Sequence, residues 1–247
     1  MWPVSPTAQP PHGGAFATTS WSRLATVQAG DGEAADRALN DLCCSYWPPL
    51  YALLRRNGHS PEDARDLVQG FLARLLERRD LEHLQPGRGR FRDYLRAGLR
   101  YHVLHELDRQ GALKRGGGVE TVFIEGPEAE RFYGPDLRAL PPDAAYDLSW
   151  ARTALGLALG RLKVEASARG LEKEFTLLAP LLGGAADGDC VAPASELGIT
   201  PAYVATKVCR LRRRLREFFE AEVALTLGPQ YDVRAEVREL LVHLAAS

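Results

Sequence analysis

The stretch from residue 199 to residue 219, ITPAYVATKVCRLRRRLREFF, concentrates positive charge in a chain that is almost neutral overall. The 247-residue sequence has a formal net charge of −1. This stretch has one acid and six cations: Lys207, Arg210, Arg212, Arg213, Arg214 and Arg216. Such a cluster is suited to phosphate groups. The charges alone are equally compatible with a solvated basic helix face.

The local pattern favours a helix, a tight turn and a second helix. Gly198 can adopt the strained backbone of the turn, Thr200 is a good N-cap, and Pro201 suits the first helical position. Apolar residues then recur every three or four positions and form a buried seam: Val204, Val208, Leu211, Leu215 and Phe218. This is the layout of a helix-turn-helix.

The side chains away from that seam are suited to the major groove of DNA. Small and hydroxyl side chains near the start of such a helix can approach base edges, and the arginines behind them can hold phosphates. The predicted DNA contacts are Thr200, Ala202, Tyr203, Thr206, Lys207, Arg210, Arg213 and Arg214.

A second basic block lies between residues 88 and 115, with eight cations and three acids. Arg92, Arg96 and Arg100 recur every four residues, so they form one stripe on a helix, with Tyr94 and Tyr101 among them. Aromatic rings stack on unpaired bases while cations follow the phosphate backbone, a combination typical of binding to single strands. The alternative that Phe91 and Tyr94 are core residues remains open.

Metal chemistry is the competing interpretation of His102 and His105, which share a helical face. No third ligand follows at a recognisable spacing, and the order does not match HExxH. The four cysteines contain no CxxC pair. We therefore predict no metal site, no cofactor and no enzymatic activity.

The elements that must position these residues are helices. No strand-like alternation persists, so we predict an all-α protein in which Ser60 and Pro61 begin the clearest helix. The expected helices are 20–29, 33–46, 48–57, 61–79, 90–110, 149–168, 171–182, 191–197, 200–222 and 232–245.

Between residues 116 and 150 the charge reverses, with seven acids and two arginines among glycine and proline breakers. We therefore expect two helical domains joined by an acidic flexible linker. The predicted boundaries are a disordered extension at 1–18, a domain at 19–115, the linker at 116–148, a domain with the helix-turn-helix at 149–225, and a helical extension at 226–247. No apolar run is long enough to span a membrane, and a cytoplasmic location is expected.

Three segments, in this order, resemble the extracytoplasmic-function (ECF) group of the sigma-70 family of bacterial RNA polymerase sigma factors. They are SPEDARDLVQGFLARLLER, GRFRDYLRAGLRYHVLHELDRQ and LGITPAYVATKVCRLRRRLREFF, with the acidic segment before the last. The resemblance covers roughly residues 40 to 222. Each segment alone is weak, and the specificity lies in their combination.

The resemblance implies promoter recognition and melting, with core polymerase and promoter DNA as partners and an anti-sigma factor as a further one. The helix after Ser60 would bind the beta-prime clamp through Asp66, Leu67, Gln69 and Phe71, and the C-terminal domain would meet the beta flap. The basic stripe would capture the minus-ten element through Arg92, Tyr94, Arg96, Arg100, Tyr101 and Arg109. The helix after Thr200 would read the minus-35 element.

The chain departs from the family pattern in three places. The loop GGAADGDCVAP interrupts the C-terminal domain, Tyr94 stands where a tryptophan is common, and both termini extend beyond the minimal plan. A helix-turn-helix regulator that acts without polymerase is the main alternative. Such regulators usually dimerise, and they do not need a second basic, aromatic region. An adaptor that has lost promoter opening is a further alternative.

Overall fold

The computed structural model describes residues 33–77, 89–112, 130–131, 133–183, 190–227 and 230–245. Every regular element in these ranges is helical, so the all-α prediction is confirmed for them. The expected helix at 20–29, the extension at 1–18 and most of the linker lie outside the described residues.

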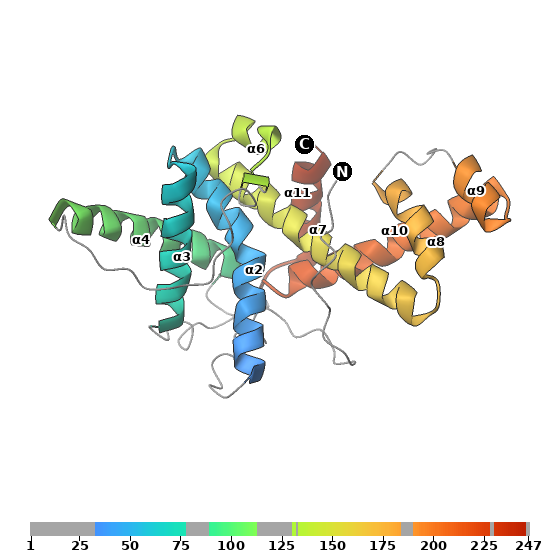
Figure 1. The fold of residues 1–247 in the computed structure, drawn as a ribbon, viewed down its shortest axis with the longest axis horizontal. Coiled ribbons are helices and arrows are strands. Elements are labelled where there is room, and N and C mark those ends of the chain that lie inside the picture. The colour runs from blue at the N-terminus through green and yellow to red at the C-terminus, as the bar shows by residue number, and fades with distance from the viewer. Residues whose placement is uncertain are drawn as a thin grey trace.

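In the N-terminal half, the residues that the structure describes form three long helices (Figure 1). They are α2 (Glu33–Arg56), α3 (Pro61–Glu77) and α4 (Phe91–Ala112). Ser60 caps α3, since its hydroxyl accepts a hydrogen bond from the backbone N–H of Asp63 at 3.1 Å. Helix α2 continues through Pro48 and Pro49, where we expected a break. Residues 46–54 are all buried, and this packing outweighs the hydrogen bonds that the prolines lack.

Helix α7 (Pro142–Ala168) crosses the centre of the molecule and contacts both α2 and α10 (Figure 1). We expected this helix to start at residue 149, with a flexible linker before it. The short helix α6 (Pro135–Ala139) and the first turns of α7 instead bury Leu137, Tyr146 and Leu148. The linker prediction is therefore wrong from residue 133 onward, because these side chains belong to the core.

After α7, the described residues of the C-terminal half form five further elements. They are α8 (Glu172–Leu178), the 3-10 helix η3 (Ala179–Leu182), α9 (Val191–Leu197), α10 (Pro201–Ala224) and α11 (Val233–Ala245). Helices α8 and α9 lie with the first half of α10 at one end of the molecule (Figure 1). The helix boundaries that we predicted in this half agree with the structure to within three residues from 171 onward.

The main hydrophobic core is shared by the two regions that we expected to be separate domains. It runs from Tyr46 and Leu50 on α2 through Trp150 on α7 to Phe219 on α10 and Leu240 on α11. A second, smaller cluster of Leu178, Ala194, Val204 and Val208 holds α9 against α10. Full burial of one such apolar side chain stabilises a fold by about 1.5 to 3 kcal/mol.

Candidate nucleic-acid interface

The turn between α9 and α10 has the geometry that its residues predict. Gly198 has φ 65° and ψ 31°, the left-handed conformation that glycine adopts without steric cost. The backbone N–H of Ile199 donates to the carbonyl of Ala194 at 3.0 Å, which closes the end of α9. Thr200 then caps α10, with its hydroxyl accepting from the N–H of Tyr203 at 3.3 Å. The turn therefore fixes the direction in which α10 begins.

The outer face of α10 is exposed along its first half. Val204 and Val208 are buried on the inner side, as predicted, and Leu211 and Leu215 pack against the core. The exposed side chains are Thr200, Ala202, Tyr203, Thr206, Cys209, Arg210 and Arg213. From Ala202 to Arg213 this face extends for about 16 Å, a length comparable to about five base pairs.

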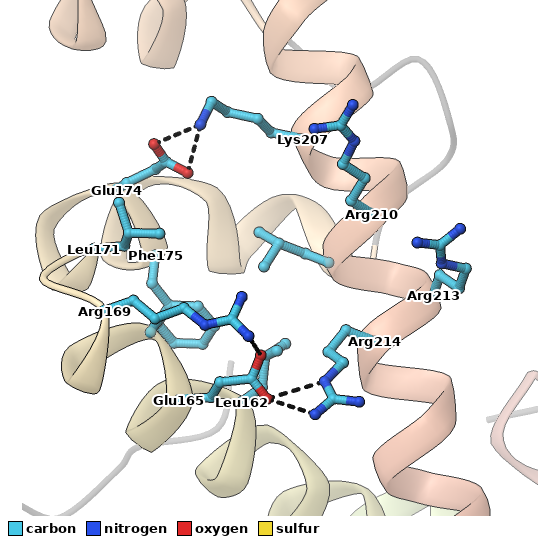
Figure 2. A pocket seen from close by; sticks show the side chains of 12 residues that line it. Leu162, Glu165, Arg169, Leu171, Glu174, Phe175, Lys207, Arg210, Arg213 and Arg214 are labelled. Carbon is cyan, nitrogen blue, oxygen red and sulfur yellow. Dashed lines mark hydrogen bonds and ion pairs between the residues drawn. The ribbon is translucent and has the colours of Figure 1, made fainter.

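Two arginines on this face are available for a ligand. Arg210 and Arg213 are exposed, and within the described part of the chain neither forms an ion pair or a side-chain hydrogen bond. In Figure 2 no dashed line joins either of them to a neighbour. They are the predicted contacts whose positive charge is not compensated by any residue that the structure describes.

The other cations of α10 have intramolecular partners. Lys207 donates to both oxygens of Glu174, at 2.8 and 2.9 Å. Arg214 donates twice to Glu165, at 2.7 and 2.9 Å, and lies over the ring of Phe218. Arg212 donates to the carbonyl of Leu181 at 2.7 Å. The predicted contacts Lys207 and Arg214 would have to exchange these partners for phosphate.

A pocket of about 570 Å³ lies beside this face, between α7, α8 and α10. Its lining includes Leu162, Phe175 and Leu211. Glu165 and Glu174 also line it, and their ion pairs with Arg214 and Lys207 connect α7 and α8 to α10 (Figure 2). Arg210 and Arg213 also contribute to the lining. The pocket thus borders the exposed face of α10.

The basic stripe of α4 is neutralised inside the molecule, which changes the role of Arg92. Only 1% of Arg92 is exposed, and its guanidinium lies 4.9 Å from the ring of Trp150, pairs with Glu236 and approaches Asp147 at 3.5 Å. In this arrangement Arg92 does not offer the predicted DNA contact at the surface, because its side chain is only 2% exposed.

Arg96 and Arg100 pair with carboxylates at the start of α7. Arg100 donates to Asp143 at 2.6 Å, and Arg96 lies within 3.7 Å of both Asp143 and Asp147. Both acids come from the segment that we predicted to be a linker. Burial raises the pKa of Asp147, and the nearby guanidinium groups of Arg92 and Arg96 partly oppose that shift.

The aromatic residues of α4 divide into core and surface. Phe91 is buried and Tyr94 packs against the core, so the alternative that we kept open for this pair is favoured. Tyr101 is 68% exposed and Leu104 is 62% exposed. Helix α4 itself extends beyond α3 (Figure 1). Of the predicted minus-ten residues, Arg100 and Tyr101 are therefore the exposed ones, and the side chain of Arg109 lies outside the described residues.

The four residues predicted to bind polymerase lie on different sides of α3. Asp66 is exposed, with 72% of its side chain accessible to solvent. Leu67 packs against the core, and Phe71 is buried. The side-chain amide nitrogen of Gln69 is buried and has no hydrogen-bond partner. Asp66 is thus the member of this set that a partner reaches without rearrangement.

The two histidines considered for zinc lie in different environments. His102 is buried beside Phe71, whereas His105 is exposed. Among the described residues, no group of three or more His, Cys, Asp and Glu side chains could hold a metal ion. No described helix is long and apolar enough to cross a membrane.

The functional residue that sequence reasoning missed is Glu236 on α11. It is 6% exposed and pairs with Arg90 and Arg92 at the start of α4. Glu236 shares one helical face with the apolar residues Val233, Val237 and Leu240, because their spacing is three or four residues. An acid on the inner face of an amphipathic helix indicates a buried partner. The identity of that partner depends on tertiary contacts across 146 residues.

Comparison of the chain with protein-family models, with curated proteins and with solved structures found no match.

Proposed function

We propose that this protein is a sigma factor of the ECF type, which directs bacterial core RNA polymerase to promoters and opens them. The observation that carries the proposal is the exposed face of α10, presented by the turn at Gly198 and carrying Arg210 and Arg213, which have no ion-pair partner in the described part of the chain. In this proposal α9 and α10 are a helix-turn-helix, and α10 enters the major groove at the minus-35 element.

The roles along α10 follow from its exposure. Ala202 and Thr206 are small enough to let the helix backbone approach base edges, and Arg210 is long enough to reach them from the next turn. Arg213 lies further along the same face and would meet phosphate. Lys207 and Arg214 serve mainly to hold α10 against α8 and α7 through Glu174 and Glu165.

The N-terminal half supports the polymerase-dependent function over the alternative of a free regulator. Asp66 lies exposed on α3, and Arg100 and Tyr101 lie exposed on α4. A regulator that only reads duplex DNA needs neither surface. In the proposal, Asp66 contacts the clamp, and the end of α4 captures an unpaired strand.

The decisive experiment is in vitro transcription with core polymerase and a library of promoter fragments. We expect initiation at a defined sequence motif that depends on this protein. If the protein instead binds duplex DNA tightly and specifically without polymerase, and adds nothing to core polymerase, the free regulator is the better description.

The polymerase contact has its own test in Asp66→Ala. We expect this variant to bind core polymerase more weakly with unchanged stability, because the Asp66 side chain is exposed and its ion pair with Arg65 is a surface one at 3.5 Å. Glu62→Ala is the matched control, since Glu62 is an exposed acid in the first turn of the same helix. Equal affinity for core in both variants would remove Asp66 from the interface.

A further inference from the structure

The C-terminal helix α11 buries an acid against the first turn of α4. The Glu236 carboxylate accepts hydrogen bonds from Arg90 at 3.1 and 3.3 Å and forms an ion pair with Arg92. Glu236 is 6% exposed and Arg92 only 1% exposed. A charge removed from water to this degree is tolerated only with a partner, so each of these groups depends on the other remaining in place.

A backbone contact joins the same two parts of the chain. The N–H of Phe91, the first residue of α4, donates to the carbonyl of Thr226 at 3.1 Å, just after the end of α10. On α11, Val237 and Leu240 are buried in the core that also contains Phe91. The start of α4 is thus attached to the C-terminal segment by charge, by a hydrogen bond and by packing.

The arginines of α4 therefore meet carboxylates from other elements. Glu236 of α11 forms ion pairs with Arg90 and Arg92. Asp143 and Asp147 of α7 lie close to Arg96, and Asp143 also forms an ion pair with Arg100. Phosphate oxygens would bind the same guanidinium groups with the same geometry. In this arrangement the stripe is occupied by acids of the protein itself.

We propose that α11 is an autoinhibitory clasp, defined by Glu236 with Arg90 and Arg92, and that its release frees these two arginines, at the start of the basic stripe of α4, to bind single-stranded nucleic acid. The inference rests on the proposed function, in which α4 is the element that contacts the opened promoter. It adds a role for the C-terminal extension, which keeps α4 inactive in the free protein.

The clasp would control binding through the fraction of molecules in which α11 is released, which are the open molecules. A ligand that binds only the open form has an apparent affinity reduced by the fraction of molecules that are open. Weakening the clasp therefore raises the affinity for single strands without adding a contact. A purely structural role for Glu236 would not produce that gain.

The test uses the full-length protein and the two variants Glu236→Gln and Glu239→Gln. Glu239 is exposed on the same helix, so its substitution makes the same change of charge without touching the clasp. Hydrogen exchange of the first turn of α4 reports opening, and fluorescence anisotropy with a random-sequence single-stranded DNA oligonucleotide reports binding. We expect Glu236→Gln to increase both the exchange rate and the affinity by roughly tenfold or more, and Glu239→Gln to change neither.

Two outcomes would overturn the clasp. Faster exchange with unchanged affinity would make Glu236 a structural residue only, and unchanged exchange would show that it does not hold α4. If Glu236→Gln loses helical circular dichroism, Glu236→Asp retains the charge and withdraws the carboxylate by one methylene, and the same readouts apply. The exchange measurement needs neither DNA nor polymerase, so failure of the proposed function in transcription assays is a separate result.

Discussion

Arg210 and Arg214 lie four residues apart on α10, yet the structure gives them different roles. Arg210 is exposed and has no partner among the described residues, whereas Arg214 is held by Glu165 and Glu217. We expect Arg210→Ala to cost about 1 to 3 kcal/mol of promoter binding and to relax the preference at one or two positions. Arg214→Ala should mainly lower the free energy of unfolding, by less than about 1 kcal/mol for a partly exposed pair.

Competition between promoter variants at two salt concentrations, combined with urea unfolding, measures both effects. A direct base contact changes the ranking of the competing sequences, and a phosphate contact changes the slope with salt. Equal and sequence-independent losses for the two variants would mean that α10 only grips the DNA backbone.

Asp147, at the junction of α4 and α7, should make the stability of the protein depend on pH. Burial raises its pKa above the ordinary value of 3.8, so the folded state binds this proton more readily than the unfolded chain does. The charged carboxylate therefore lowers stability at neutral pH, and the native protein gains stability as the pH falls through the raised pKa. We expect Asp147→Asn to be at least as stable as the parent at pH 7.

The measurement is urea unfolding of both proteins across the acid range. The advantage of Asp147→Asn should shrink as the pH falls through the raised pKa of Asp147, because the parent carboxyl group then becomes protonated as well. A difference that grows toward low pH would show that the ion pairs with Arg92 and Arg96 outweigh burial and that the pKa is lowered.

At the scale of elements, two glycines give opposite expectations for the same substitution. Gly198 adopts φ 65° in the turn before α10, and Gly160 lies within α7, where a Cβ atom would meet nothing within 4 Å. Gly198→Ala should destabilise the protein by about 1 to 2 kcal/mol, because alanine is strained in the left-handed conformation. Gly160→Ala should stabilise it by about 0.5 to 1 kcal/mol, because alanine loses less backbone entropy in a helix.

Chemical denaturation of the two variants measures both changes in the free energy of unfolding. Since Gly198 also has open space around its Cβ position, a loss there reports backbone strain without a steric clash. A neutral Gly198→Ala would indicate that the turn relaxes to another conformation, and the direction of α10 would then not depend on this glycine.

The helices with strong local signals could be predicted from the sequence. Ser60 and Thr200 cap α3 and α10 as expected, and Gly58 and Gly198 have positive φ. The seam through Val204 and Val208 is buried because its spacing matches one helical face.

Features set by distant contacts could not be predicted. The start of α7 at Pro142 depends on Tyr146, whose hydroxyl donates to the carbonyl of Arg92 at 2.8 Å. The burial of Arg92 depends on Glu236, which follows it by more than a hundred residues. Residues 133–148 were predicted to be a linker from their acids and helix-breaking residues. Composition does not reveal that two of those acids, Asp143 and Asp147, have arginine partners in α4.

At the scale of the whole molecule, the shared core makes the two halves one cooperative unit. Leu50 on α2 and Phe219 on α10 are both buried in the core cluster that includes α7. Two independent domains would unfold in two steps, and a substitution in one would leave the other unchanged. A chain whose halves pack on one central helix should lose both together.

We therefore expect Leu50→Ala and Phe219→Ala to shift the same thermal transition. Each removes a buried apolar group and should cost about 2 to 5 kcal/mol, because the cavity adds to the lost transfer free energy. Circular dichroism reports all helices, and fluorescence reports Trp47 and Trp150 in the core, so coincident curves in both variants indicate a single transition. Val242→Ala, at a position 67% exposed on α11, is the control that should change little. If Phe219→Ala lowers only one of two resolved transitions while Leu50→Ala lowers the other, the halves are separate domains and α7 does not couple them.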